Sequence, residues 1–219
     1  MIDEKFKRQI DLIDPDTISF NIHIIGVGGI GSWTALLAAK MGCTEIHVYD
    51  DDIVESHNTA SQFFKVDQLG QKKVEAIKSN IEEQSGISIF THEQKMEDKI
   101  EDGLVIIAVD SMEERIKLFK MFKDKKVYVI DARMGGLQME IYRMPAKKWG
   151  DTLVDPSVVE PEPCTGRSIC FNCAVIGGII THYIRLFGKK EIQDGEMIFL
   201  FSNPLFLSQK KYDTGKNKE

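Results

Sequence analysis

Short apolar runs alternate with amphipathic stretches along most of the chain. The runs at 20–25, 45–49, 104–109 and 127–130 are rich in Ile and Val, and stretches such as 68–84 between them carry apolar residues at helical spacing. Continuous apolar runs predict strands that are buried on both faces, and the helical stretches predict crossover connections. The pattern therefore predicts an α/β fold with a doubly wound, Rossmann-like sheet that is mostly parallel.

The pattern changes after residue 136. Residues 137–144 alternate apolar and polar positions as a half-exposed strand does, and 197–207 has the composition of a last pair of strands. We expect these C-terminal strands to be antiparallel. Between them, 145–169 is rich in proline and predicts a long crossover, whereas 174–186 predicts an apolar helix. The charged residues 209–219 predict a disordered tail.

The length favours one domain. The chain has 219 residues, of which 42% are hydrophobic, enough for one well-buried α/β core and short for two. We expect a single domain over 1–208, with a nucleotide-binding core at 20–136 and a substrate and crossover region at 137–208. Residues 1–19 predict a short amphipathic helix that packs outside the nucleotide core.

Charge and hydropathy exclude some classes of function. The net charge is −6 at pH 7, which disfavours an extended surface for nucleic acid. We find no apolar run that approaches the ~18 residues of a membrane span, and the N-terminus lacks the apolar core of a signal peptide. The sequence therefore predicts a cytoplasmic protein with no membrane partner.

A glycine turn follows the first predicted strand. It holds Gly26, Gly28, Gly29 and Gly31. In a strand–turn–helix unit such glycines permit a tight turn, a close approach of backbone to phosphate, and close packing of helix on strand. Asp50 ends the second strand 19 residues after Gly31, at the spacing where a carboxylate binds ribose hydroxyls. This unit predicts a nucleotide site, and NAD, FAD, S-adenosylmethionine and ATP all remain open.

With the polar loop after Asp50 in view, the chain resembles the E1-like adenylating superfamily of ThiF, MoeB, HesA and the ubiquitin-activating enzymes. Members share Gly-x-Gly-Gly-x-Gly, then Asp-x-Asp-x-Val with a later Asn and Gln, then Gly-x-x-Lys, then an Asp that closes a strand. The matching residues here are Gly26 to Gly31, Asp50 to Val54 with Asn58 and Gln62, Gly70 to Lys73, and Asp110. The resemblance spans nearly the whole chain.

The resemblance implies an activity and assigns residues to it. In the family, a carboxylate attacks the α-phosphorus of ATP, pyrophosphate leaves, and an acyl-adenylate remains. The resemblance implies that ATP is bound by the glycine turn, Asp50, Asp52, Asn58, Gln62 and Lys73. Asp50 would bind the ribose, and Lys73 would bind phosphate oxygens. Asp110 is implied as the ligand of Mg²⁺, and Arg115 matches an arginine of the following helix.

The resemblance also implies a homodimer. Phe6-Lys7-Arg8-Gln9 is similar to the family's Arg-Tyr-x-Arg-Gln. In the family this arginine reaches the ATP of the partner subunit, so Arg8 is implied as a catalytic residue in trans. The implied substrate is either the C-terminal Gly-Gly of a ubiquitin-like sulfur carrier or a small-molecule carboxylate, as in assembly of the guanylylpyridinol cofactor of iron hydrogenase.

One departure leaves two other functions open. The family has a phosphate-binding arginine where this chain has Ser61, and serine lacks its charge and planar fork. Lys65 or a cation of the substrate are candidates to replace it. The alternatives are a non-catalytic nucleotide-binding scaffold and an NAD-dependent oxidoreductase on the same fold.

Three of the four cysteines are clustered as Cys164-x5-Cys170-x2-Cys173. Three thiolates with His182 or a water would form a tetrahedral zinc site. In the family this region can also carry the cysteine that takes the acyl group, and Cys164 suits that role, while Cys170 and Cys173 are equally read as packed thiols. Cys43 is expected in the core.

Four other residues have structural and functional alternatives. We expect His23 and His47 to be packed histidines of strands, and Trp33 to pack. Arg133 follows a strand end, where it either binds the carboxylate of a substrate or pairs with Asp131.

Overall fold

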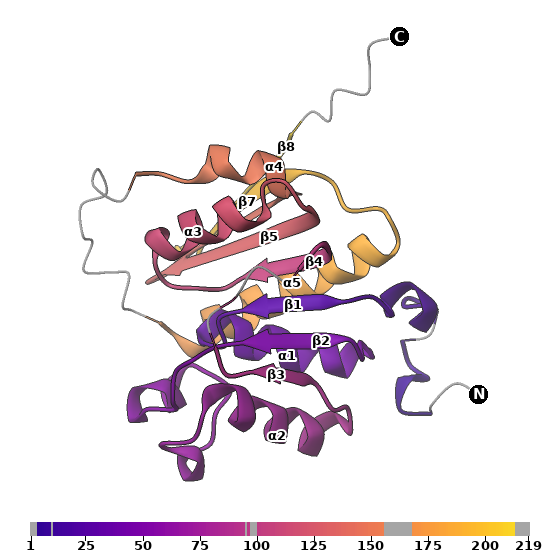
Figure 1. Cartoon of the computed structure of the whole chain (residues 1–219), viewed down its shortest axis with the longest axis vertical. Coiled ribbons are helices and arrows are strands. Elements are labelled where there is room, and N and C mark those ends of the chain that lie inside the picture. Colours follow the sequence, from indigo (N-terminus) through magenta and orange to yellow (C-terminus); the bar gives the residue numbers. More distant parts are fainter. Residues whose placement is uncertain (1–3, 10, 95, 97–99, 156–167, 213–219) are drawn as a thin grey trace.

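A computed structural model describes residues 4–9, 11–94, 96, 100–155 and 168–212 (Figure 1). Its described strands form one sheet in the order β3-β2-β1-β4-β5-β6-β7-β8. Neighbours from β3 to β5 pair in parallel, and those from β5 to β8 pair antiparallel. The predicted fold, a mostly parallel doubly wound sheet with antiparallel C-terminal strands, is confirmed.

The strands β1, β2, β4 and β5 begin within two residues of the predicted apolar runs, but β5 extends beyond its run to Gly135. The strands are β1 Ile22–Ile25, β2 Ile46–Tyr49, β3 Phe90–His92, β4 Asp102–Ile107, β5 Lys126–Gly135, β6 Gln138–Pro145, β7 Gly195–Leu200 and β8 Phe206–Lys211. The longer helices are α1 Gly29–Met41, α2 Lys73–Ser85, α3 Met112–Phe122 and α5 Cys170–Gly188, and α4 is the short Ala146–Trp149. Because β1, β2 and β4 are parallel, their carboxyl ends meet at one edge of the sheet, where the nucleotide is expected.

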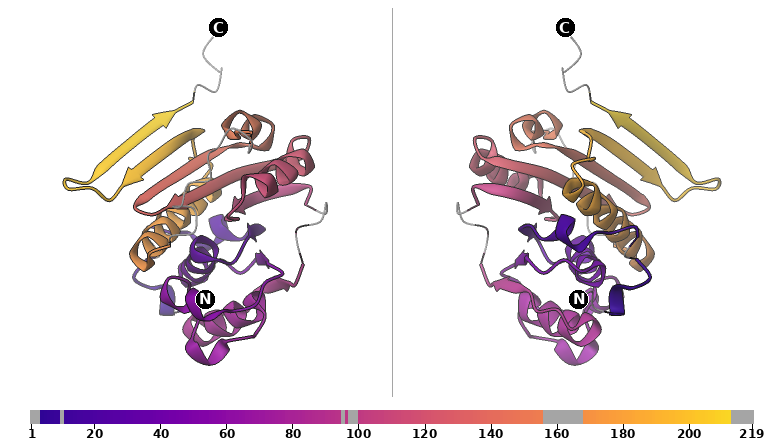
Figure 2. Two further views of the ribbon diagram at one scale, coloured as in Figure 1. Left: turned by 90° about the vertical axis from the view of Figure 1, so that its left-hand side faces the viewer. Right: turned by 90° about the vertical axis from the view of Figure 1, so that its right-hand side faces the viewer.

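The two faces of the sheet are covered by different helices. Buried residues of α1, α2 and α5 form one cluster with Ile24, Val48 and Ile106. Residues of α3 and α4 form a second cluster on the other face with Val105 and Val129. Figure 2 shows this layering, and it shows β7 and β8 extending beyond the helices.

Two N-terminal 3-10 turns, Glu4–Phe6 and Pro15–Ile18, replace the expected amphipathic helix. Asp14 caps the second turn by accepting a hydrogen bond from the Asp16 N–H at 3.0 Å. The side-chain amide of Gln9 donates to the Met41 carbonyl at 2.7 Å, which ties the segment to the end of α1. Tertiary contacts of this kind override a weak helical pattern.

The C-terminal part differs from the prediction in two places. Gln209 was expected to begin a disordered tail, yet residues up to Lys211 belong to β8, where they pair with β7. Their backbone hydrogen bonds explain why polar composition misled the prediction. The crossover begins with α4 and a 3-10 turn at Gly150–Thr152, and its residues 156–167 lie outside the described part.

Helix α5 is long and apolar enough, by length and composition, to cross a membrane, contrary to the expectation from the sequence. One face of it is buried in the core through Ile176, Ile180 and Ile184. A single such helix is weak evidence for a membrane span, because a core helix passes the same test.

Candidate functional site

The glycine turn leaves one face of its backbone open. Gly26 adopts φ +91°, and a Cβ there would lie 2.6 Å from the Ala108 carbonyl oxygen of the neighbouring strand end. A Cβ on Gly28 would meet nothing nearer than the Gln62 side-chain nitrogen at 4.0 Å. Gly28 is also the N-cap of α1 and supplies no side-chain cap. The first N–H groups of α1 are therefore available to an anion.

Asp50 is fixed by the turn that it faces. One carboxylate oxygen accepts from the Val27 N–H at 2.7 Å, and the other accepts from the Asp52 N–H at 2.9 Å. Burial raises the pKa of Asp50, while Lys73 and these two N–H groups act in the opposite direction. Each oxygen keeps a second lone pair, so the carboxylate can still accept from ribose hydroxyls.

Lys73 begins α2 at the same edge of the sheet. Its ammonium nitrogen lies 2.7 Å from a carboxylate oxygen of Asp52, and its backbone N–H donates to the Asp52 carbonyl at 3.0 Å. Lys73 is buried, whereas the Asp52 side chain is 67% exposed. Because the Asp52 carboxylate is exposed, it can rotate away from Lys73 and leave the ammonium group open to an anion.

Asn58 and Gln62 come from the loop between β2 and α2. Asn58 is buried, and its side-chain oxygen accepts from the Glu55 N–H at 2.8 Å, which shapes the loop. Gln62 lies next to Gly28, and its side-chain oxygen is buried with no hydrogen-bond partner in the described part of the chain. A buried acceptor without a partner is costly, and a donor on a bound ligand would satisfy it.

Asp110 lies at the carboxyl end of β4. It is exposed, and it follows Ala108, whose N–H donates to the Ile25 carbonyl and whose carbonyl packs against Gly26. Ser111, next in the chain, caps α3 by accepting from the Glu114 N–H at 3.1 Å. An exposed carboxylate beside the glycine turn has the donor chemistry that Mg²⁺ prefers.

The sequence anticipated one buried ionic network only in part. Asp131 is fully buried, and its two oxygens bind the Arg115 Nε at 2.9 Å and the Arg133 side chain at 2.6 Å. The Trp149 indole N–H also donates to it at 2.9 Å. Of the two alternatives for Arg133, the structure therefore shows the pairing with Asp131. Arg133 also donates to Thr152, which anchors the start of the crossover.

Ser61, at the position where the resemblance implies an arginine, is buried. Its carbonyl accepts from the Trp33 indole N–H at 2.9 Å, and Trp33 packs edge-on against Phe63 as expected of a packed residue. Lys65, the candidate replacement, forms an ion pair with Glu83 instead. In this conformation the ammonium group of Lys65 is therefore held by a residue of α2.

The histidines of the strands are packed. His23 is buried and its Nδ1 lies 3.0 Å from the Tyr49 hydroxyl, while His47 stacks between His23 and Phe90. Burial, helped by His47 and His92, lowers the pKa of His23 to about 4. A neutral stacked ring suits a structural role.

The cysteines divide between two environments. Cys170 is exposed and Cys173 is buried, at the start of α5, and Cys43 is buried in the core as expected. Cys164 lies outside the described residues, so its roles as acyl acceptor and zinc ligand stay predictions. His182 is nine residues beyond Cys173, or roughly 13 Å along a helix. The two side chains therefore cannot share one tetrahedral zinc ion.

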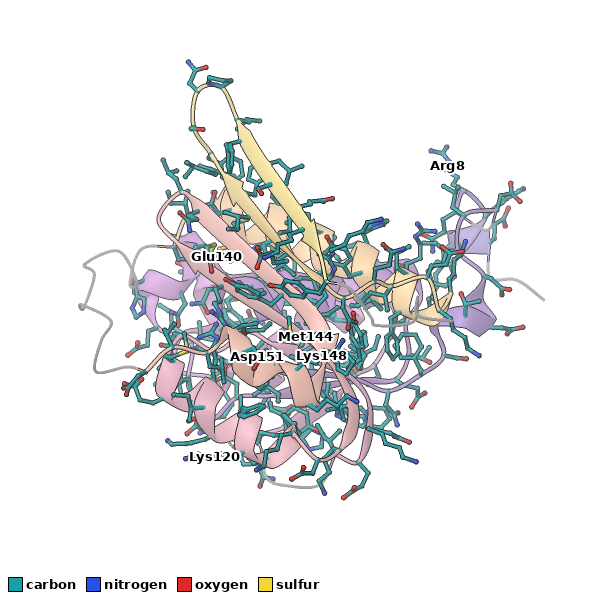
Figure 3. The ribbon with its side chains drawn as sticks, turned by 90° about the horizontal axis from the view of Figure 1, so that it is seen from above. Arg8, Lys120, Glu140, Met144, Lys148 and Asp151 are labelled. Atoms are coloured by element: carbon teal, nitrogen blue, oxygen red, sulfur yellow. The ribbon has the colours of Figure 1, made fainter. Side chains whose placement is uncertain are left out.

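Arg8 lies far from the glycine turn of its own chain. Its neighbour Gln9 is tied to Met41 at the end of α1, and α1 has 13 residues, or about 20 Å of helix, between Met41 and the turn. Figure 3 shows Arg8 projecting away from the body of the protein. The structure brings the other predicted ATP-binding residues to one edge of the sheet but leaves Arg8 apart.

Comparison with known proteins identifies a family. The ThiF family model matches residues 16–193. Ubiquitin-like modifier-activating enzyme 5 of Xenopus laevis is 29% identical over 119 residues, which cover 46% of this chain and 30% of that protein. The uncharacterized protein y4qC of Sinorhizobium fredii is 41% identical over 61 residues, which cover 28% of this chain and 10% of that protein. The chain thus spans under a third of either curated relative.

Solved structures share the fold. The crystal structure of PaaA aligns with a TM-score of 0.75 and 19% identity, over 95% of this chain and 72% of that one. The structure of E. coli MccB with ATP aligns with a TM-score of 0.75 and 15% identity, over 99% and 73%. At these identities the likeness concerns the arrangement of strands and helices.

Proposed function

Because the chain belongs to the ThiF family, we propose that it is an ATP-dependent adenylyltransferase that activates a carboxylate as an acyl-adenylate. The observation that carries the proposal is the uncapped start of α1 behind Gly28, with Asp50 and Lys73 at the same edge of the sheet. This edge offers N–H donors for phosphate, a carboxylate for ribose and a cation for charge.

The protein would promote the proposed reaction by neutralising charge and by aligning the reacting groups. An oxygen of the substrate carboxylate bonds to the α-phosphorus of ATP, the bond from that phosphorus to the bridging oxygen breaks, and pyrophosphate leaves. The α1 N–H groups and Lys73 stabilise the charge that builds on the phosphate oxygens. Asp110 would hold Mg²⁺, which neutralises the leaving pyrophosphate when bound. Asp50 and Gln62 would orient the nucleoside.

We propose a peptide or carrier-protein carboxylate as the substrate. Solved structures with the same fold include E. coli MccB together with MccA, and the curated relative above is named for ubiquitin-like modifiers. The Gly-Gly tail of a ubiquitin-like carrier is one form of such a substrate, and a small-molecule carboxylate is the alternative. A homodimer in the cytoplasm fits the exposed Arg8 and the free thiols of Cys43, Cys170 and Cys173.

A non-catalytic scaffold is the second candidate. The buried Ser61 favours it, because serine cannot form the bidentate contact of the family's arginine and Lys65 is paired with Glu83. The variant Ser61→Arg separates the two functions. An adenylating enzyme should bind ATP more tightly or turn over faster with the added guanidinium, whereas a scaffold gains no turnover.

Calorimetry tests the proposal first. Titration with ATP·Mg and, separately, with NAD should show binding of ATP alone. The variant Asp110→Ala should bind ATP·Mg more weakly but fold normally, because Asp110 is exposed. The control is Asp124→Ala, which changes an exposed carboxylate beyond the other end of α3 and should bind ATP·Mg as the wild type does. Peptides ending in Gly-Gly should then support exchange of pyrophosphate into ATP. Binding of NAD alone would overturn the proposal.

A further inference from the structure

Two cysteines occupy the first turn of α5. Cys170 is the first residue of the helix and is exposed, whereas Cys173 is fully buried. Residues three apart in a helix have Cα atoms about 5 Å apart. This separation lies inside the range of roughly 4.4–6.8 Å that disulfides span. The Cys-x-x-Cys pair can therefore close without unwinding the helix.

The surroundings give the two thiols different reactivity. Cys170 is exposed at the first position of α5, where a small disulfide can reach its sulfur, whereas Cys173 is buried three residues further along the helix. Burial raises the pKa of Cys173, and its sulfur lies 3.2 Å from the Ser168 hydroxyl. Cys170 is thus the accessible nucleophile and Cys173 the protected second thiol.

The buried thiol of Cys173 also lies against the glycine turn. A Cβ on Gly29, the first residue of α1, would be 2.9 Å from the Cys173 sulfur and 3.0 Å from the Ser168 hydroxyl oxygen. Gly29 follows Gly28, whose open face is the proposed phosphate site. The position of the Cys173 sulfur therefore sets the packing beneath the N–H groups of the turn.

We propose that Cys170 and Cys173 form a redox-active dithiol that is oxidised by low-molecular-weight disulfides and that controls the glycine turn. The Cys170 thiolate attacks one sulfur of the disulfide, its S–S bond breaks, and one thiolate leaves. Cys173 then gives up its proton to the solvent and attacks the Cys170 sulfur, and the second thiolate leaves. The protein loses two electrons and two protons, and two small thiols form.

Oxidation should weaken nucleotide binding, which is the part of the inference that rests on the proposed function. The new bond draws the Cys173 sulfur toward Cys170 and away from Gly29. The turn loses a packing contact, so its N–H groups are held less well for phosphate. We expect ATP to bind about five-fold or more weakly to the oxidised protein, within the usual range of such coupling.

Peptide mapping tests the disulfide without any nucleotide. The full chain is equilibrated with reduced and oxidised glutathione, alkylated and cut with trypsin. Cleavage after Arg167 and Arg185 places both thiols in one peptide of residues 168–185, apart from Cys164. We expect this peptide to lose two hydrogen atoms as the glutathione becomes oxidised. Cys173→Ser should instead stop at a glutathione adduct on Cys170.

A second measurement tests the coupling. Amide exchange over residues 28–31 should rise on oxidation of the wild type and stay constant in Cys170→Ser, which cannot close the bond. ATP titration of the same samples should show weaker binding to the oxidised wild type than to the reduced wild type. Oxidation should not change ATP binding by Cys170→Ser. Absence of the oxidised peptide, or zinc bound by the purified protein in place of reactive thiols, would overturn the dithiol. A disulfide with unchanged exchange would overturn its control of the turn, and loss of ATP binding in every sample would count against the adenylating function alone.

Discussion

The carbonyl oxygen of Gly26 lies 1.9 Å from the point that a Cβ on Gly31 would occupy. No rotamer change relieves this clash, because both groups are backbone. We therefore predict that Gly31→Ala lowers the free energy of unfolding by roughly 2 kcal/mol or more, as overpacked sites do. Urea titration followed by circular dichroism measures this loss.

Gly28→Ala is the matched control. Its Cβ would meet only the flexible Gln62 side chain at 4.0 Å, so the stability should change by less than about 1 kcal/mol. The added methyl would nevertheless cover the open face of the turn, and ATP affinity should fall. Equal destabilisation by the two variants would contradict the distinction between a packing glycine and a binding glycine.

We predict that substitution of Asp131 causes a large loss of stability. Asp131→Asn leaves the buried guanidinium of Arg115, and that of Arg133, without its anion. Breaking a buried pair from one side costs roughly 3–5 kcal/mol. Thermal unfolding measures the loss. Asp151→Asn, which changes an exposed carboxylate near Trp149, should leave the melting temperature unchanged, and a stable Asp131→Asn would mean that solvent compensates the arginines.

His23 predicts a stability that depends on pH. Its pKa is about 4 in the folded protein and 6.5 in the unfolded chain. Between these values only the unfolded chain binds the proton, so stability is fully present above about pH 6.5 and falls as the pH drops toward 4. The shift corresponds to roughly 3 kcal/mol.

Unfolding titrations between pH 4 and 7 measure the effect. His23→Phe should remove most of the slope, although it leaves the Tyr49 hydroxyl without its partner. The exposed His57→Phe should keep the slope. An unchanged slope in His23→Phe would assign the pH dependence to other groups.

Arg8 predicts complementation between subunits. Because Arg8 lies about 20 Å from its own glycine turn, it would serve the site of a second copy. Arg8→Ala and Lys73→Ala should each be inactive alone, and mixing them should restore part of the activity in sites with intact Lys73 and a partner's intact Arg8. A mixture as inactive as its components would mean that each site is complete within one chain.

The sequence predicted those features of the site that depend on residues close together in the chain or on adjacent strands. The glycine turn and Asp50 depend on residues that are neighbours or lie on adjacent strands, so spacing was sufficient. The polar end of β8, Gln209 to Lys211, was missed because an edge strand is specified by its pairing with β7 and not by its own polar composition.

Long-range contacts left no signal in the sequence. Arg115 and Asp131 are 16 residues apart and meet only because α3 packs over β5. Cys173 meets Gly29 from the other end of the chain. Neither contact has a periodicity, so only the folded structure reveals them.

The chain's two tryptophans report on different parts of it. Trp33 binds the Ser61 carbonyl beside the nucleotide turn, whereas Trp149 is fully buried against the opposite face of the sheet and donates to Asp131. Their emission is therefore separable with Trp33→Phe and Trp149→Phe. We expect the emission of Trp33 to respond when a ligand binds at the glycine turn, and the emission of Trp149 to report whether the fold is intact.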